Sequence, residues 1–229
     1  TVVTKSGGND IHGSMFEYLR NSNMDARNFF DADKSPLRLN QFGGSLGGPI
    51  IKNKLFFFGA YEGLRQRASV NFIETVPSDA ARARAVPSIA PLLNAFPRGT
   101  ERSANSDLDV ARLNASYPID EDYGSIRLDY QINASHRVSA RYFRDQGYLQ
   151  QPLGVTGNQF QISAVPQNAM LSVQSIVSAN KLNEFRFGFN GAKTRASGYA
   201  PSVNGIDMSA ISIDFTGNVA LSGIGGQGN

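Results

Sequence analysis

The stretch that decides the fold is GSIRLDYQI, residues 124–132, in which polar and apolar side chains alternate from Ser125 onward. The alternation resumes after the short polar segment NASH, 133–136, in RVSARYF, 137–143. Successive side chains of a β-strand point to opposite faces, so this period of two indicates strands with one apolar and one polar face. Two such runs joined by a short polar turn predict an antiparallel hairpin.

The same design occurs twice more in the chain. LSVQSIV, 171–177, is followed by the turn SANK, 178–181, and then by EFRFGFN, 184–190, where Phe alternates with polar residues or Gly. An earlier hairpin is predicted from 41–50 and 55–65, joined by IKNK at 51–54. Asn in such a turn tolerates the left-handed backbone that tight hairpin turns require.

The lengths of the strands and connections favour a membrane barrel over a soluble sheet. We expect strands of about 9–12 residues, which is close to the 9–11 of a tilted membrane strand and longer than the 5–6 of a typical soluble strand. Short turns alternate with long links at 66–122 and 148–167, and a further loop follows Arg195. Prolines break the helical pattern of 78–96 into short turns. The prediction is an all-β fold, an antiparallel transmembrane β-barrel segment of about seven long strands with short periplasmic turns and long extracellular loops.

Tyrosines fall near the expected strand ends, where an interfacial girdle of a membrane barrel lies. Aromatic residues are also common in any sheet, so this placement is weaker support. The tyrosines concerned are Tyr18, Tyr61, Tyr123, Tyr142 and Tyr148.

Composition excludes several classes of protein. The 229 residues are 41% hydrophobic, carry a net charge of +3 and contain no Cys. The absence of Cys excludes a disulfide framework, a zinc ribbon and a thiol nucleophile. No run approaches 18 apolar residues, so no transmembrane helix is expected. The small net charge without a long basic run argues against a nucleic-acid partner.

The first 65 residues resemble TonB-dependent outer-membrane transporters, and within them the Oar-like group. Looser similarity continues in RLDY, 127–130, and HRVSARY, 136–142. The segments that carry the resemblance are TVVTKSGGN at 1–9, HGSMFEY at 12–18, DARNFF at 25–30, NQFGGSLGGPI at 40–50 and KLFFFGAYEGLR at 54–65.

The resemblance implies a domain arrangement and a function. Residues 1–11 correspond to the C-terminal end of a plug domain, and 12–229 to the N-terminal part of a 22-stranded barrel. The chain is then expected to be an internal piece of a longer protein of a Gram-negative-type outer membrane. Its partners are outer-membrane lipid, the TonB complex through a plug region outside this sequence, and an unknown solute that is imported or exported. No enzymatic activity and no cofactor are expected.

Motifs that could support an enzyme or metal site lack the context that those sites need. GGSLG, 43–47, matches a nucleophile elbow, which requires a helix after the Ser, but Gly48 and Pro49 follow it. GIGGQG, 223–228, matches a dinucleotide fingerprint without a following helix. His12 and His136 have no partner at metal-ligand spacing. A loop cluster of acidic residues is expected to be solvated or, less often, to bind a cation; it comprises Asp107, Asp109, Asp120, Glu121 and Asp122.

Charged residues at alternating strand positions are the candidates for the lumen of the barrel, because a wide barrel has a wet interior whereas an Arg facing lipid costs about 2–4 kcal/mol. They either pair with neighbouring strands and the plug or contact the solute. These lumen-facing candidates are Arg127, Asp129, Arg141, Glu184 and Arg186.

Two other hypotheses stay open at the level of sequence. One is a soluble secreted β-domain that binds carbohydrate or protein, which would bury the Phe stripe at 185–189 under a second layer. The other is a hydrolase built around Ser45.

Overall fold

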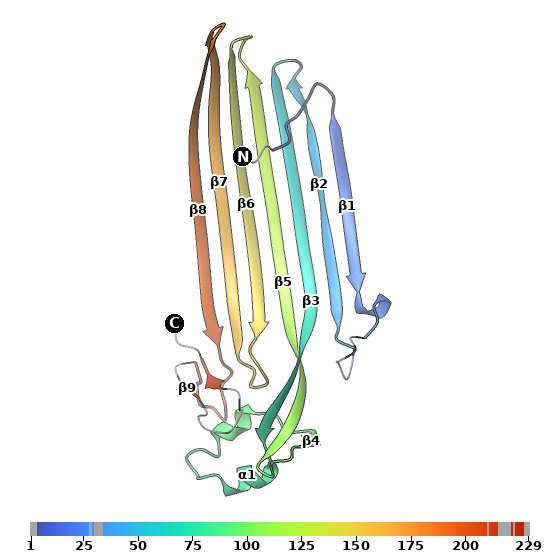
Figure 1. The fold of residues 1–229 in the computed structure, drawn as a ribbon, viewed down its shortest axis with the longest axis vertical. Coiled ribbons are helices and arrows are strands. Elements are labelled where there is room, and N and C mark those ends of the chain that lie inside the picture. Colours follow the sequence, from blue (N-terminus) through green and yellow to red (C-terminus); the bar gives the residue numbers. More distant parts are fainter. Residues whose placement is uncertain are drawn as a thin grey trace.

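Seven long strands lie side by side in one antiparallel layer, in the computed structural model of this chain (Figure 1). The structure describes residues 4–27, 29, 34–209, 211–214, 221 and 223–226. Neighbouring strands follow the order of the chain, β1-β2-β3-β5-β6-β7-β8. The short strand β4 lies off this path and pairs with β5. The strands are β1 (His12–Asn21), β2 (Leu37–Ile51), β3 (Leu55–Pro77), β4 (Glu101–Arg102), β5 (Leu108–Gln131), β6 (His136–Pro152), β7 (Gln159–Ser178) and β8 (Lys181–Tyr199). The all-β antiparallel prediction is confirmed.

Three tight turns join the strands at the upper end of Figure 1. At the first turn, Asn53 has a φ of 60°, and the Lys54 amide donates to the Ile51 carbonyl at 3.0 Å. This is the left-handed turn that the Asn predicted. At the second turn, the side-chain oxygen of Asn133 accepts from the amides of Ser135 and His136, both at 2.9 Å. The left-handed backbone of Asn53 at the first turn, and the local hydrogen bonds of the Asn133 side chain at the second, therefore help to fix where these two hairpins reverse.

The strands are longer than the sequence predicted. β3 has 23 residues and β5 has 24, and they stay paired from Leu55 opposite Tyr130 to Pro77 opposite Leu108. The predicted link 66–122 therefore shrinks to a loop of 78–107, and the predicted link 148–167 shrinks to 153–158. The expectation of long loops in these ranges was wrong in extent, because backbone pairing continues where the side-chain alternation becomes irregular.

Loops gather at the opposite end of the sheet and pack on one another (Figure 1). The loop between β3 and β5 contains the helix α1 (Asp79–Arg84) and the 3-10 helix η2 (Leu92–Ala95), which confirms the short helical turns predicted there. Another 3-10 turn, η1 (Ser22–Met24), follows β1, and the two-residue strands β9 (Ser212–Ile213) and β10 (Ile224–Gly225) pair after β8. Within the described residues, no helix is long and apolar enough to cross a membrane.

The hydrophobic core lies among these loops and not along the long strands. We call this region, which comprises 78–107, 153–158 and the described residues after Tyr199, the loop cap. Its residues come from the far ends of β3 and β5, from the loop between these strands, from the loop before β7 and from the segment after β8. Val76 and Met208 are completely buried, and Phe96 is 3% exposed. The buried cluster consists of Val76, Phe96, Ala111, Val155, Ala200, Val203, Met208 and Ile224.

Arg82 ties the cap together through backbone carbonyls. Its Nε donates to the Pro77 carbonyl at 3.0 Å, and its Nη2 donates to the carbonyls of Pro97 at 3.0 Å and Phe96 at 3.2 Å. Its Nη1 also donates to the carbonyl of Leu93. Burial lowers the pKa of the Arg82 guanidinium from its usual value. The Arg82 side chain of α1 thus connects the end of β3 with η2 and the residues that follow η2.

We expect Arg82→Ala to open this loop, because each hydrogen bond from a charged donor contributes about 1.5–3 kcal/mol and buried carbonyls are left unpaired. Cleavage by proteinase K within 78–107 should accelerate about tenfold or more in the full-length protein. The matched control is Arg84→Ala, two residues along the same helix, whose side chain is 64% exposed and pairs with Asp107 at the surface. Equal cleavage of the two variants would contradict the role given to Arg82.

Candidate functional site

The five charged candidates lie on one face of the sheet. Arg127 of β5 is directly opposite Arg141 of β6, and Arg141 is opposite Met170 of β7. Ser172 of β7 is opposite Arg186 of β8. Asp129 and Glu184 each lie two positions along a strand from one of these arginines and so share their face. We call this side of the sheet the polar face.

The opposite face of the same strands is apolar. Three Phe side chains of β8 lie on it: Phe185 is 60% exposed, Phe187 63% and Phe189 50%. The described residues provide no second layer that would cover them, as the single sheet in Figure 1 makes clear. The register places Phe185 beside Val173 and Phe187 beside Leu171 of β7. These rows continue across β6 and β5 through Val138, Ala140 and Leu128.

Toward the loop cap, the apolar face becomes charged. Tyr61 of β3 marks the change, since its hydroxyl donates to the Asp122 carboxylate at 2.6 Å. Beyond it, Arg65 pairs with Asp122 at 2.8 Å and Arg67 pairs with Asp120 at 2.7 Å. Two members of the acidic cluster predicted in a loop are therefore strand residues neutralised by arginines.

Tyrosines lie at the same level of two strands on this face. Tyr61 is opposite Gly124, and Tyr142 is opposite Ile126, two residues along β5. The Tyr142 hydroxyl donates to the Gln167 side chain at 3.0 Å. Tyr123 lies on the polar face, opposite Asp145, and so does not share the face of Tyr61 and Tyr142.

Asp129 is the centre of the charged network on the polar face. Its side chain is 2% exposed, and it accepts from Arg127 at 2.7 and 2.9 Å. Ser139 also donates to this carboxylate, at 2.7 Å, and Arg137 does so at 3.3 Å. Four donors on two strands thus surround a carboxylate that is almost inaccessible to water.

A second carboxylate lies toward the edge of the sheet. Glu184 of β8 accepts from Arg186 Nε at 2.8 Å and from the hydroxyl of Ser172 at 3.1 Å. Its side chain is 35% exposed, so this pair is better hydrated than the pair at Asp129.

The N-terminal segment crosses the polar face and is held to it at three places. Arg127 Nη1 donates to the Thr4 carbonyl at 2.9 Å and to the Thr4 hydroxyl at 2.8 Å. A Cβ on Gly7 would lie 2.2 Å from the carbonyl oxygen of Phe57, so only Gly allows this close approach to the sheet. Asn9 exchanges hydrogen bonds with Asn53 at 2.6 and 2.8 Å. Residues 1–3, which belong to the predicted plug strand, lie outside the described residues.

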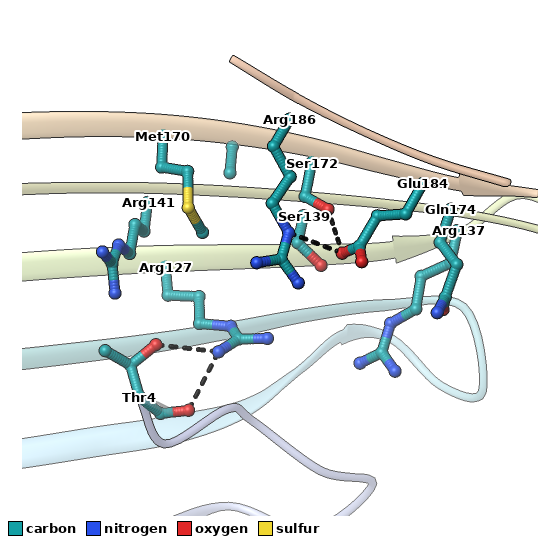
Figure 2. Close-up of a pocket in the computed structure, with 11 residues that line it drawn as sticks. Thr4, Arg127, Arg137, Ser139, Arg141, Met170, Ser172, Gln174, Glu184 and Arg186 are labelled. Atoms are coloured by element: carbon teal, nitrogen blue, oxygen red, sulfur yellow. Dashed lines mark hydrogen bonds and ion pairs between the residues drawn. The ribbon is translucent and has the colours of Figure 1, made fainter. Parts of the chain in front are cut away.

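Figure 2 shows the cavity that these elements line, with arginines of β5, β6 and β8 and Thr4 of the N-terminal segment around the same space. Its volume is about 550 Å³. Arg127, Arg141, Glu184 and Arg186 line it, whereas Asp129 lies beneath and touches it only through its partners. Lining residues that the sequence did not single out are Thr4, Arg137, Ser139, Ala140, Met170, Ser172 and Gln174. Arg137 and Ser139 lie an even number of residues from Arg141 along β6 and so share its face. The alternation of the sequence could therefore have identified them as candidates.

The enzyme and metal motifs do not assemble into a site. Ser45 lies within β2, and its hydroxyl is 3.0 Å from that of Ser14 on β1. A turn and β3 follow, so the strand–helix context of a nucleophile elbow is missing there. In the described part of the chain, no three His, Cys, Asp or Glu side chains are arranged to hold a metal ion. Of the glycine motif at 223–228, only 223–226 are described, and they include β10.

The chain belongs to the outer membrane beta barrel domain family, whose sequence profile matches residues 3–87 and 82–228. It is therefore an outer-membrane protein of the all-β class. A curated relative is the TonB-dependent transporter Oar of Myxococcus xanthus, which is 36% identical over 68 residues. This match covers 26% of the present chain and 6% of the relative, so the chain spans only a small part of it. No solved structure matches.

We expect Asp129→Asn to destabilise the sheet, because it leaves two arginines beside a neutral, buried amide. Removing one partner of a buried ion pair costs about 3–5 kcal/mol. The matched control is Glu184→Gln, the same chemical change at the more exposed carboxylate, which should have little effect. Resistance of the full-length protein to urea, followed by the mobility shift of folded barrels on gels, measures both. An effect of Glu184→Gln as large as that of Asp129→Asn would contradict this assignment.

Proposed function

We propose that this chain forms part of the wall of a TonB-dependent outer-membrane transporter, with the apolar face toward lipid and the polar face toward the lumen. The opposed faces are the observation that carries the proposal. Charges on the side that faces lipid would be costly, whereas the exposed Phe stripe of β8 suits a hydrocarbon environment. The polar face, with its arginines and carboxylates, suits a hydrated interior.

The distance that the apolar face spans along the strands supports this orientation, because it is close to the height of the apolar band of a membrane barrel. From Leu55 to Tyr61 the strand rises by about 20 Å, at about 3.4 Å per residue. An outer-membrane barrel presents an apolar band about 25 Å tall that ends in aromatic girdles. Tyr61 and Tyr142 then lie at the outer boundary, and the Arg–Asp pairs beyond them lie in water. The loop cap projects outside the cell, and the three tight turns face the periplasm.

Similarity to the Oar transporter supports the further assignment of domains and partners. Residues 1–11 form the end of a plug domain, and 12–229 form the first strands of a larger barrel. Within the described residues β1 and β8 each pair on one side only, and lipid does not tolerate an unpaired sheet edge. Further strands of the full-length protein would complete the pairing. TonB would act on the plug region, and the protein would move a solute without chemical change to it.

The contact between Thr4 and Arg127 fits this arrangement. Thr4 would then be part of the plug end and Arg127 part of the lumenal wall, so a pull on the plug would be transmitted to a residue of β5. Arg127 is also tied to Asp129, so the segment is anchored to a rigid part of the sheet.

The proposed facing predicts different outcomes for Arg introduced at adjacent positions of β8. Phe187→Arg should block membrane assembly of the full-length protein, because it places a charge in lipid at a cost of about 2–4 kcal/mol. Gly188→Arg introduces the same side chain on the polar face, where a Cβ would lie 3.9 Å from its nearest neighbour, the Ala169 carbonyl oxygen, and should assemble. Arg186→Ala should assemble as well. The yield of heat-modifiable protein in outer-membrane fractions is the measurement, and equal yields for Phe187→Arg and Gly188→Arg would reject the facing.

Transport energised by TonB predicts uptake that needs both proteins. Cells of the source bacterium, a strain that lacks this protein and a strain that lacks TonB are incubated with a mixture of peptides, glycans and metal chelates. Mass spectrometry of the medium should find a compound that the parent depletes and neither deletion strain does. Depletion that needs this protein and continues without TonB would contradict energisation by TonB.

A further inference from the structure

The cavity lined by Thr4 and the arginines carries more positive charge than its carboxylates can balance. Four guanidinium groups face it or border it, from Arg127, Arg137, Arg141 and Arg186, against the two carboxylates of Asp129 and Glu184. Both carboxylates are already engaged. Positive charge therefore remains without a counter-charge among the described residues.

The surplus is concentrated at Arg141. Its Nε is buried and has no hydrogen-bond acceptor, and the guanidinium makes no ion pair with any residue that the structure describes. A buried donor without an acceptor is costly, and buried polar groups in folded proteins are nearly always paired. Among the four guanidinium groups of the cavity, that of Arg141 is therefore the one without an ion pair to a described residue, and it is the most open to an added acceptor.

A second, independent observation also points to a missing anion. Arg141 lies directly opposite Arg127 on the neighbouring strand. Like charges directly opposite each other in an antiparallel pair are destabilising. Arg127 is fixed by Asp129 and Thr4, so it cannot turn away without losing these hydrogen bonds. An anion in the cavity would relieve this repulsion and give Arg141 its acceptor.

We propose that this cavity binds the carboxylate or phosphate group of a small anionic solute, with Arg141 as the principal donor and Arg186 as a second. Arginine presents paired donors that match both groups. The volume of about 550 Å³ lies within the range of small-molecule sites. Met170, opposite Arg141, offers an apolar contact for the rest of the solute. The inference rests on the proposed function, because it names the class of solute that meets the lumenal wall.

Isothermal titration calorimetry on the full-length protein, purified in detergent at low ionic strength, tests this site. The probes are inorganic phosphate and succinate, and succinamide serves as the neutral analogue of succinate. We expect phosphate and succinate to bind and succinamide not to bind. Binding should weaken as sodium chloride is added, because salt screens the attraction between the charges.

Arg141→Gln should weaken binding of both anions about tenfold or more, since it removes charge-assisted hydrogen bonds. Arg144→Gln is the matched control, on the same strand but on the opposite face, where Arg144 contacts only the Gln146 side chain among the described residues. It should change the affinity less than about twofold. Arg141→Lys keeps the charge and should show an intermediate loss, so it carries the comparison if Arg141→Gln does not assemble.

Three results would overturn the anion site: no binding of either anion to the assembled wild-type protein, equal binding of succinamide, or equal weakening by the substitutions at Arg141 and Arg144. If an acidic side chain of the full-length protein filled the cavity, neither anion would bind, which is the first of these results. These failures leave the transporter proposal intact, because that proposal is tested separately by membrane assembly and by TonB-dependent uptake.

Discussion

A sheet inside a membrane has only neighbouring strands to satisfy its backbone, because hydrocarbon offers no hydrogen bonds. The long uninterrupted ladders of this chain follow from that constraint. β3 and β5 remain paired from the tight turn beside Leu55 to the cap at Pro77, so the backbone groups between them have partners whichever medium surrounds the strands. Once the backbone is satisfied, side chains are free to adapt each face to its own surroundings, which produces the apolar and polar faces.

This division explains why the long strands have no buried core. In a soluble sheet, a face such as that of Phe185 and Phe187 would be covered by another layer of protein. In the proposed orientation lipid takes that role, and within the chain itself Phe185 and Phe187 are 60% and 63% exposed. The compact core of the described residues forms around Val76 and Met208, where loops that carry apolar side chains can pack against one another and exclude water.

Features of the fold and of the candidate site could be predicted where they depend on residues close together in the sequence, and not where they depend on residues far apart. Alternation is local, so the faces of Arg127, Arg141 and Arg186 followed from the sequence. The extent of the strands did not, because residues 108–119 carry polar and apolar side chains without a regular period. The contact of Arg127 with Thr4 joins residues 123 positions apart and has no sequence signal. Arg82 was likewise hidden, since its partners are backbone carbonyls, which every residue possesses.

The polar face combines two demands that pull in opposite directions. A rigid wall needs its charges paired, and Asp129 with Arg127, Arg137 and Ser139 meets that demand with a nearly inaccessible carboxylate. A surface that binds a solute, as proposed here, needs charges that are not yet paired. Arg141 is such a charge among the described residues. Arg127 and Arg141 are neighbours on β5 and β6. Arg127 holds the N-terminal segment at Thr4, whereas Arg141 would stay open to an incoming group under the proposal. Pairing both would make the wall inert, whereas leaving both unpaired would place two opposed cations on adjacent strands with nothing to offset their repulsion.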